Sequence, residues 1–363
     1  MRVCFIVGEI FHWGNYGGFG ALTRTIGANL VKKGIEVYVL LLYNTKEKHR
    51  AIETLDGMTV ISLPSRRNLT FYKACDADIY HSEDASSGTY FAIKAMPDRK
   101  HIITFQDPMY FEELVLSQLS FHSNWSNPFY RINQKVRYKI GDFLVGKAVR
   151  KADGLFSQAN YIVPKISSMY ELKKSAEFLP NPVEVPKRPM KKADEPTVCF
   201  LGRWEPVKRV EDFMELAKRF PDVRFIATGK AHNEERDQFL RKKYRDVPNL
   251  EMPNWVFGEE KSKTLEKSWI LINPSIRECL PVSFLEAGAY ECAILSSNNP
   301  DNFAEKFGYH VRDNDFAKGL KFLLEDEEWR ERGKVGRKYV EDVHELERVL
   351  QRHMEIYEKL LET

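Results

Sequence analysis

The sequence predicts an α/β protein in which two Rossmann-like, doubly wound parallel-sheet domains face a central cleft. Its 363 residues exceed the ~250–300 residues at which chains usually divide into domains. Short apolar runs alternate with helical patterns in two successive series, which is typical of parallel sheets covered by helices on both faces. A segment rich in proline and charged residues separates the series. Such folds bind ligands in the crevice outside the carboxyl ends of their strands, so we expect the site there.

The first series predicts an N-terminal domain over residues 1–180. A helix over Ala21–Lys33 carries Leu22, Ile26 and Leu30 on one face, because residues three or four apart share a face of a helix. The buried strands expected around this helix are Val3–Val7, Val37–Leu42, Thr59–Leu63, Ile79–His81, His101–Phe105 and Gly154–Ser157.

The segment Leu179–Pro196 suits neither a helix nor a strand, and we place the interdomain linker at residues 181–196 within it. A second domain over residues 197–345 follows the linker. The strands expected there are Val198–Leu201, Arg224–Thr228, Leu250–Met252, Trp269–Asn273 and Ala293–Ser296. The helices expected between them are residues 210–220, 233–245, 259–267 and 281–290. The tail from Asp315 is nearly all helical, and its last helix, 346–363, could pack back on the N-terminal domain.

The composition excludes several classes of protein. A net charge of +3 is too small to indicate a nucleic-acid partner. No apolar run approaches the ~20 residues that a membrane span needs. The five cysteines form no C-x-x-C pair, so neither a disulfide framework nor a zinc site is indicated. These features predict a cytoplasmic protein with reduced thiols.

The segment Asn273–Ala287 carries a candidate anion site. A buried strand ends at its first residue, and Pro281 opens a helix, where a missing N–H group costs nothing. The free N–H groups near Val282 and Ser283 can then bind an anion at the start of the helix.

Two carboxylates flank this candidate anion site. Glu278 precedes the helix and Glu286 lies within it. A pyrophosphate on the helix amides would have one carboxylate near each end, suited to the hydroxyls of a sugar and of a ribose. An ordinary amphipathic helix with two solvated glutamates fits the spacing equally well.

Two further segments lie between a predicted strand and a helix. Phe200–Arg209 places Arg203 and Lys208 in one turn, where two cations and a helix start can converge on an anion. A surface loop with solvated bases is the alternative. Gly14–Gly20 is a glycine-rich turn that lets the backbone approach a ligand closely, although a plain strand–helix turn is favoured from the glycines alone. It does not have the G-x-G-x-x-G pattern of dinucleotide-binding proteins.

The strand-to-helix segment with the two glutamates resembles the E-x7-E motif of glycosyltransferase family 4, a large retaining family with the GT-B fold. The match, PSxxExxPxxxxEA, extends well beyond the two acids. The resemblance implies that Glu278 contacts the donor sugar and that Glu286 contacts the ribose. It also implies donor contacts from the residues between them, Leu280, Val282 and Ser283.

Other segments are similar to elements of the same family. The segment with Arg203 and Lys208 is similar to the G-R-x-x-x-x-K element, whose basic residues bind the diphosphate. The glycine-rich turn is similar to the GG-x-G loop, which implies that Gly17 and Gly18 lie beside the donor phosphate and the acceptor. Asp78–His81 is similar to a D-x-x-H strand of the family.

The clearest departure from the family is Gln106. Many relatives have histidine at this position, where it is thought to touch the transferred sugar near its reacting carbon. Glutamine can donate a hydrogen bond but does not titrate, which puts an acid–base role here in doubt. The linker also departs, because Asn181-Pro182-Val183 stands where the family often has Asn-Gly-Val-Asp.

The resemblance implies a retaining hexosyltransferase. It would move a hexose-type sugar from a UDP- or GDP-linked donor to an acceptor hydroxyl in the interdomain cleft, with no cofactor and no metal ion. The acceptor could be a carbohydrate, a lipid-linked molecule or a small molecule, and no nucleic acid is expected as a partner. The catalytic residues that it implies are Arg203, Lys208, Glu278 and Gln106. The alternatives are a sugar-nucleotide epimerase of the same fold and a non-catalytic scaffold that binds nucleotide sugars.

The triplet Asp76-Ala77-Asp78 has the D-x-D pattern that binds a metal ion in the other large glycosyltransferase fold. It precedes a predicted strand, whereas a metal site is expected at the exit of a strand. The nine histidines show no spacing typical of metal ligands. We therefore expect no metal site at this triplet.

The stretch 131–151 is basic and has a helical pattern. Ile132, Val136, Ile140 and Leu144 lie on one stripe among seven lysines and arginines. Such a helix could associate weakly with the inner, anionic face of a membrane. The favoured interpretation is a helix that packs on the sheet and exposes only its basic face.

Overall fold

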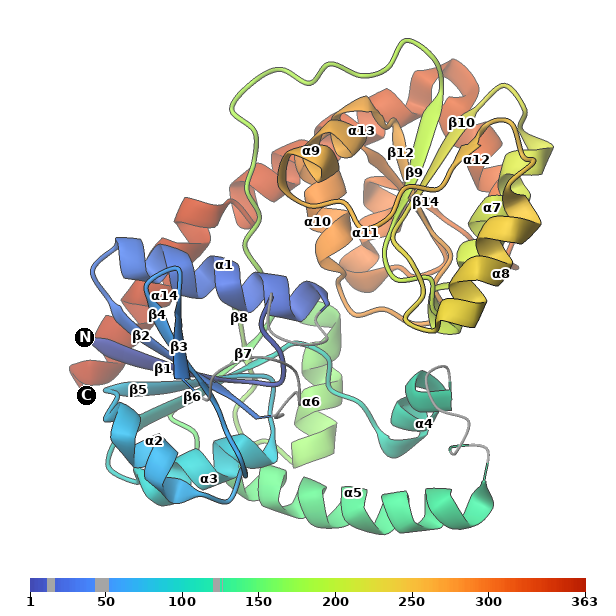
Figure 1. The fold of residues 1–363 in the computed structure, drawn as a ribbon. Helices are drawn as coiled ribbons and strands as arrows, with labels where there is room; N and C mark the ends of the chain where they lie inside the picture. Colours follow the sequence, from blue (N-terminus) through green and yellow to red (C-terminus); the bar gives the residue numbers. More distant parts are fainter. Residues whose placement is uncertain (12–16, 43–51, 120–124, 126) are drawn as a thin grey trace. The chain divides into compact units, whose positions relative to one another are not determined.

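The computed structural model of the chain describes residues 1–11, 17–42, 52–119, 125 and 127–363. The chain divides into two compact units. Unit 1 contains the described residues up to Pro182 together with Glu347–Thr363, and unit 2 is Val183–Leu346. Each unit has the predicted architecture, a largely parallel sheet covered by helices (Figure 1).

The described residues of unit 1 form a sheet with the strand order β3-β4-β2-β1-β5-β6-β7-β8. Neighbouring strands are parallel, except that β3 is antiparallel to β4. Neither β3, a mostly exposed strand, nor β8, a pair of residues, was predicted, because neither has an apolar run. The strands are β1 (Arg2–Val7), β2 (Glu36–Leu41), β3 (Ile52–Leu55), β4 (Met58–Ser62), β5 (Ile79–Glu83), β6 (Lys100–Phe105), β7 (Gly154–Ser157) and β8 (Glu177–Phe178).

The first helix of unit 1, α1, buries the predicted face. Leu22, Ile26 and Leu30 lie in its core. The helices are α1 (Gly18–Lys32), α2 (Leu69–Cys75), α3 (Ser87–Ala95), α4 (Phe111–Leu119), α5 (Pro128–Val149), α6 (Val163–Tyr170) and α14 (Leu346–Leu361).

Helix α5 leaves its apolar stripe exposed, which corrects the favoured interpretation of the stretch 131–151. Ile132, Val136 and Ile140 are 61%, 54% and 61% exposed. The buried residues of α5 lie in its last turns, where the helix packs against α3: Gly146, Ala148 and Val149. The 22-residue helix extends beyond its contact with α3 (Figure 1). Helix α3 therefore does not cover the earlier turns, which carry the exposed stripe.

The described residues of unit 2 form a parallel sheet with the strand order β11-β10-β9-β12-β13-β14. Strand β14 was not predicted, because it is only three residues long and contains the polar His310. The strands are β9 (Thr197–Leu201), β10 (Arg224–Thr228), β11 (Leu250–Glu251), β12 (Ile270–Asn273), β13 (Ala293–Ser296) and β14 (Gly308–His310).

Aromatic residues fill the core of unit 2. Phe213 packs between Phe200 and Phe225, and Trp329 stacks on Trp269 with ring centroids 4.4 Å apart. The helices around the sheet are α7 (Val210–Arg219), α8 (Glu234–Tyr244), α9 (Gly258–Lys267), α10 (Val282–Ala289), α11 (Phe303–Lys306), α12 (Phe316–Leu324) and α13 (Glu328–Val343). The helical tail predicted from Asp315 consists of α12, α13 and α14.

The proline-rich segment after Pro182 is tied to unit 2 by polar contacts. The N–H group of Val183 donates to the carbonyl oxygen of His344 at 2.8 Å. Further along, the ammonium of Lys192 donates to the carbonyl oxygens of Ser268 and Tyr290, both at 2.6 Å. These bonds hold a segment that contains no helix or strand apart from the isolated β-bridge between Val183 and Glu345.

Helix α14 packs in unit 1 through a buried polar contact with the central sheet. The hydroxyl of Tyr357 is 2.8 Å from Nδ1 of His81 in β5, whose Nε2 is 2.7 Å from the hydroxyl of Thr104 in β6. Burial lowers the pKa of His81 well below its ordinary value, so the imidazole is neutral and both of its nitrogens are hydrogen bonded.

We expect Tyr357→Phe to lower the free energy of unfolding of unit 1 by roughly 1–3 kcal/mol, because Nδ1 of His81 loses its partner in the core. Urea unfolding followed by circular dichroism measures the change. The matched control is Tyr110→Phe, since Tyr110 is exposed. An equal loss of stability in both variants would contradict a specific role for the buried hydroxyl.

Candidate functional site

Two loops meet at the carboxyl edge of the sheet of unit 2. One follows β9 and the other follows β12, and these strands are neighbours and parallel. The N–H group of Ile276 in the second loop donates to the carbonyl oxygen of Val207 in the first at 2.8 Å. The segments that carry the predicted site residues of this unit are therefore in direct contact.

An ion pair joins the same two loops. Lys208 ends a short 3-10 turn, Pro206–Lys208, and its Nζ is 2.6 Å from Oε1 of Glu278. The side chains of Lys208 and Glu278 are only 22% and 9% exposed. Asn273, the last residue of β12, donates from Nδ2 to the same carboxylate oxygen at 3.1 Å.

Glu278 is held in its charged form. Burial by itself would raise the pKa of this carboxyl group, but the charge and hydrogen bond of Lys208, together with the hydrogen bond of Asn273, outweigh burial and lower the pKa below its ordinary value. The backbone N–H group of Glu278 donates to Oδ1 of Asn298 at 3.1 Å, which also fixes the main chain of the loop. The structure thus supplies a fixed, negatively charged side chain at this edge.

Arg203 lies in the turn after β9, beside a close approach of two backbones. Gly229, with a φ of +114°, faces the carbonyl oxygen of Gly202, and a Cβ atom at this position would come within 2.0 Å of that oxygen. The next residue, Trp204, is buried, and the guanidinium of Arg241 lies 4.5 Å from its ring centroid. The turn that carries Arg203 is therefore well packed.

Glu205 in this turn is a site residue that sequence reasoning did not single out. Its Oε1 accepts from the backbone N–H group of His232 at 2.9 Å and lies 3.0 Å from Nδ1 of the same residue. Burial opposes ionisation, but the bonds from His232 and the charge of Arg203 leave the pKa of Glu205 below its ordinary value. The predicted basic turn thus also contains a buried carboxylate.

Helix α10 begins at Val282, one residue later than predicted. Pro281 is its N-cap residue, with a φ of −71°, and no side chain caps the helix. Val282 and Ser283 lie in the first turn, where N–H groups have no preceding carbonyl within the helix. Leu280 is buried immediately before them.

Glu286 lies in the middle of α10 and is paired with α9. The ammonium of Lys261 is 2.5 Å from its Oε1, and the two side chains are 33% and 21% exposed. The predicted E-x7-E pair thus has one lysine on each carboxylate. No sequence signal pointed to Lys261, because nothing local relates it to α10.

Gln106 lies at the carboxyl edge of the sheet of unit 1, after β6. It is 2% exposed, and its Nε2 donates to Oε2 of Glu83 at 2.8 Å and to Oδ1 of Asn181 at 3.1 Å. Both N–H donors of the amide are used within unit 1. A hydrogen bond from Gln106 to a sugar would have to replace one of them.

The start of α1 carries the two glycines predicted to lie beside the donor phosphate. Gly17 precedes the helix and Gly18 begins it, while residues 14–16 of the predicted loop lie outside the described residues. The N–H groups of Gly17 and Gly20 both donate to Oε1 of Glu9 at 2.9 Å. A carboxylate of the chain itself therefore occupies this helix start, so a phosphate here would compete with Glu9.

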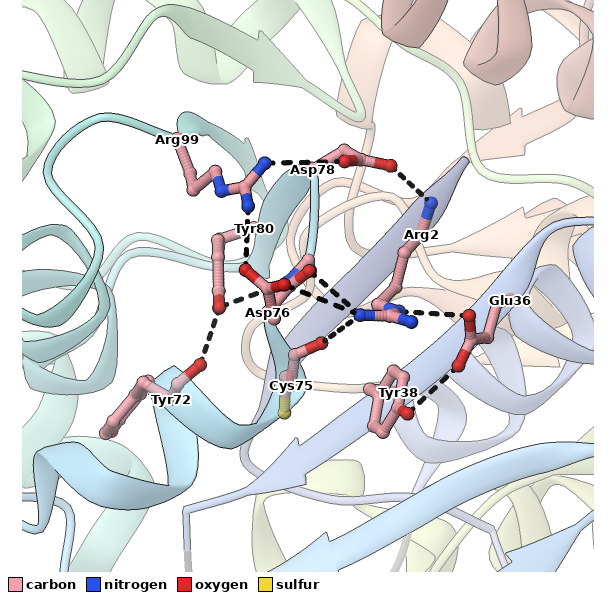
Figure 2. A network of polar contacts seen from close by, with 10 residues as sticks. Arg2, Glu36, Tyr38, Tyr72, Cys75, Asp76, Asp78, Tyr80 and Arg99 are labelled. Atoms are coloured by element: carbon pink, nitrogen blue, oxygen red, sulfur yellow. Dashed lines mark hydrogen bonds and ion pairs between the residues drawn. The ribbon is translucent and has the colours of Figure 1, made fainter.

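The acidic residues of the D-x-D triplet are bonded to arginines at the amino edge of the same sheet (Figure 2). The guanidinium of Arg99 donates to Asp76 at 2.7 Å. Oδ2 of Asp78 accepts from the backbone N–H group of Arg2 at 2.7 Å. Among the described residues, no group of three or more histidine, cysteine, aspartate or glutamate side chains is placed to hold a metal ion.

No helix in the described part of the chain has the length and hydropathy needed to cross a membrane.

Comparisons with known proteins relate the chain to glycosyltransferases. Residues 184–338, within unit 2, match the family model described as glycosyl transferases group 1. No curated protein matches the chain. Sucrose-phosphate synthase from Thermosynechococcus elongatus is similar in structure, with a TM-score of 0.75 and 15% identity over 99% of this chain and 98% of the other.

Two other solved structures are similar over nearly all of both chains. HepE from Anabaena, in complex with UDP-glucose, has a TM-score of 0.70 and 11% identity, over 99% of this chain and 100% of the other. The catalytic domain of starch synthase IV from Arabidopsis thaliana, bound to ADP and acarbose, has a TM-score of 0.65 and 12% identity, over 100% of this chain and 99% of the other.

These structural likenesses confirm the GT-B fold, and the family match in unit 2 confirms the expected enzyme class. The chain is a glycosyltransferase. The group 1 match spans Arg203, Lys208, Glu278 and Glu286, so the paired carboxylates of this glycosyltransferase lie in the part of the chain that resembles the family.

We expect Lys208→Ala to destabilise unit 2 of the glycosyltransferase by roughly 1–3 kcal/mol near neutral pH, because the carboxylate of Glu278 loses a charged partner. A carboxyl group whose pKa is lowered by folding stabilises the folded state above its unfolded pKa, and this contribution is lost as the pH falls through the folded pKa. The difference between the variant and the wild type should therefore shrink as the pH falls below about 4.

Urea unfolding near neutral pH and below about pH 4 measures this difference. Lys261→Ala is the matched control. Its partner Glu286 is more exposed than Glu278, so this variant should lose less free energy of unfolding than Lys208→Ala. A destabilisation of Lys208→Ala that is the same at both pH values would contradict the electrostatic explanation.

Proposed function

We propose that the chain is a retaining, metal-independent member of glycosyltransferase family 4 that moves a hexose-type sugar from a UDP- or GDP-linked donor to an acceptor hydroxyl. The observation that supports this most is the Lys208–Glu278 pair, which joins the loops after β9 and β12 beside the start of α10. The UDP-glucose in the Anabaena structure and the ADP in the Arabidopsis structure make a nucleotide sugar the natural ligand to test.

The proposed role of Lys208 is compatible with its bond to Glu278. An ammonium group has three N–H donors, so Lys208 can hold Glu278 and still donate to a phosphate. The negative charge that develops on the leaving diphosphate would be met by Arg203, Lys208 and the free N–H groups of Val282 and Ser283. Preorganised donors of this kind contribute a few kcal/mol each to the stabilisation of a transition state.

Glu278 and Glu286 are proposed to bind opposite ends of the donor. A carboxylate accepts hydrogen bonds from neighbouring hydroxyls, and Glu278 would hold hydroxyls of the sugar while Glu286 holds those of the ribose. The lysines that pair with them orient both groups, and Lys208 also keeps Glu278 charged. The acceptor oxygen would attack on the face from which the diphosphate leaves, with a phosphate oxygen as base, which retains the configuration without a protein nucleophile.

The decisive experiment is to incubate the protein with UDP-, GDP- and ADP-glucose and to measure nucleotide diphosphate release, with and without EDTA. We expect release from one donor that survives EDTA. Glu286→Ala should weaken binding of the bare nucleotide diphosphate by roughly 1.5–3 kcal/mol in calorimetry, because a charged acceptor is lost.

Three outcomes would contradict the proposal. Activity that is lost in EDTA and restored by magnesium or manganese would overturn the metal-independent mechanism. Conversion of the nucleotide sugar to its epimer without nucleotide release would favour the epimerase, and tight binding without any turnover would favour the scaffold. Unchanged nucleotide affinity in Glu286→Ala would remove the ribose role.

We also propose that helix α5 rests on the anionic, cytoplasmic face of a membrane. Its exposed apolar residues follow one helical stripe: Phe129, Ile132, Val136, Ile140 and Phe143. Exposed basic residues accompany the stripe: Lys135, Arg137, Lys139 and Lys147. An apolar stripe with basic flanks is complementary to acyl chains beneath anionic headgroups, and it would bring the enzyme to a lipid-linked acceptor.

We expect the protein to sediment with vesicles that contain anionic lipid and much less with neutral vesicles. Ile132→Ser combined with Ile140→Ser should weaken this association about tenfold or more, because each isoleucine contributes on the order of 1.5–3 kcal/mol when it leaves water. Val335→Ser is the matched control, since Val335 is similarly exposed on a different helix, α13. A dimer that the double variant disrupts, with no vesicle binding, would contradict the membrane proposal.

A further inference from the structure

Polar side chains gather where four neighbouring strands of unit 1 end. Glu83 is the last residue of β5, Gln106 follows β6, Gln158 follows β7 and Asn181 follows β8. The carboxyl group and the three amides are all nearly or fully buried. Because buried polar groups need defined partners, the orientation of each side chain here depends on the next.

The hydrogen bonds between these side chains form one connected network, in which Gln106 and Asn181 bond to each other in both directions: Nε2 of Gln106 donates to Oδ1 of Asn181 at 3.1 Å. Nε2 of Gln106 donates to Oε2 of Glu83 at 2.8 Å. Oε1 of Gln106 accepts from Nδ2 of Asn181 at 2.9 Å, and Nδ2 of Asn181 also donates to Oε1 of Gln158 at 3.3 Å. Nε2 of Gln158 donates back to the carbonyl oxygen of Gln106 at 3.1 Å.

The charge of Glu83 explains how the amides of this network are oriented. An ionised carboxylate can only accept hydrogen bonds, whereas an amide can present either its N–H groups or its oxygen. A charged Glu83 therefore requires Nε2 of Gln106 to face it. That choice turns Oε1 of Gln106 towards Nδ2 of Asn181, and the amide of Asn181 in turn requires the oxygen of Gln158.

We propose that Glu83 is the positioning residue of this network: its charged carboxylate fixes the orientation of the buried amides of Gln106, Asn181 and Gln158, and its protonation releases them. After Glu83 is protonated, a half-turn of its carboxyl group brings the hydroxyl to Gln106, where it can donate to Oε1, so the amide can rotate and the neighbouring amides can follow. The consequence for catalysis rests on the proposed function, in which Gln106 lies near the transferred sugar.

The surroundings of Glu83 favour such a change near neutral pH. Burial raises the pKa of Glu83 to about 7, opposed by the hydrogen bond from Gln106 and reinforced by the charge of Asp84. Among the described residues, no group donates a hydrogen bond to Oε1 of Glu83. A proton can therefore be added to this oxygen without breaking a bond.

Among the residues that the structure describes, the other titratable groups around Glu83 do not supply a positive charge to hold it ionised. Nε2 of His81 in β5 lies 3.8 Å from Oε1 of Glu83, and burial lowers the pKa of this imidazole. On α14, Tyr357 bonds to His81, and burial lowers the pKa of His353 to about 4. The remaining ionisable groups near Glu83 at this sheet edge are acidic: Asp84 and Asp107.

The test follows the side-chain amide of Gln106 by NMR between pH 5.5 and 8.5. We expect the chemical shift of its Nε2 group to change with pH, with a midpoint near the pKa of Glu83, which is about 7. We expect Glu83→Gln to remove this change. The rate of sugar transfer should fall about tenfold from the plateau one pH unit below the midpoint, and this fall should also be absent in Glu83→Gln.

Asp84→Asn is the matched control, because burial raises the pKa of Asp84 to about 6 and the residue adjoins Glu83. We expect the titration of Gln106 to persist in this variant. A titration that disappears in Asp84→Asn and persists in Glu83→Gln would overturn the proposal, as would a resonance of Gln106 that does not move with pH.

The two proposals can fail separately. If the protein transfers no sugar but the resonance of Gln106 titrates only when Glu83 is present, the proposed function is wrong and the positioning role stands. If transfer occurs with a pH profile that is the same in Glu83→Gln and in the wild type, the positioning role is wrong and the proposed function stands.

Discussion

The Lys208–Glu278 ion pair is the constraint on which the candidate donor site depends. It joins loops that follow two neighbouring strands, and both side chains are largely withdrawn from water. A nearly buried carboxylate without a cation would be costly, so the two loops cannot separate without exposing or neutralising it. The backbone hydrogen bond from Ile276 to Val207 joins the same two loops. Together these contacts set where the loop before α10 lies relative to the turn that carries Arg203.

The sequence predicts the elements that have strong local patterns, and it cannot predict their charged partners. The alternation of strands and helices gives both sheets, and the spacing of the two glutamates locates the loop and helix that follow β12. The pairing of Glu286 with Lys261 depends on how α9 packs beside α10, which no local pattern encodes. Helix α5 illustrates the same limit, because an apolar stripe defines a face of a helix but not what covers that face.

The two sheets each have a buried glutamate at their carboxyl edge, but the hydrogen-bond partner of the glutamate differs between them. In unit 2, Glu278 is matched by a lysine and its pKa is lowered. In unit 1, Glu83 is matched by an amide, and burial raises its pKa. The glutamine at 106 therefore does not leave this edge without an ionisable group. The capacity to titrate lies instead on the preceding strand, which explains why a comparison of position 106 alone gives an incomplete description of the site.

The bond between Glu9 and the start of α1 has a consequence for which molecules can approach this helix. A tethered group acts as an intramolecular competitor whose effective concentration is on the order of millimolar. Any dissolved anion must displace the carboxylate from the amides of Gly17 and Gly20 or meet its repulsion. An uncharged hydroxyl can instead donate to the carboxylate while those amides remain bonded. A neutral hydroxyl at this helix start would therefore avoid the repulsion that a free phosphate would meet.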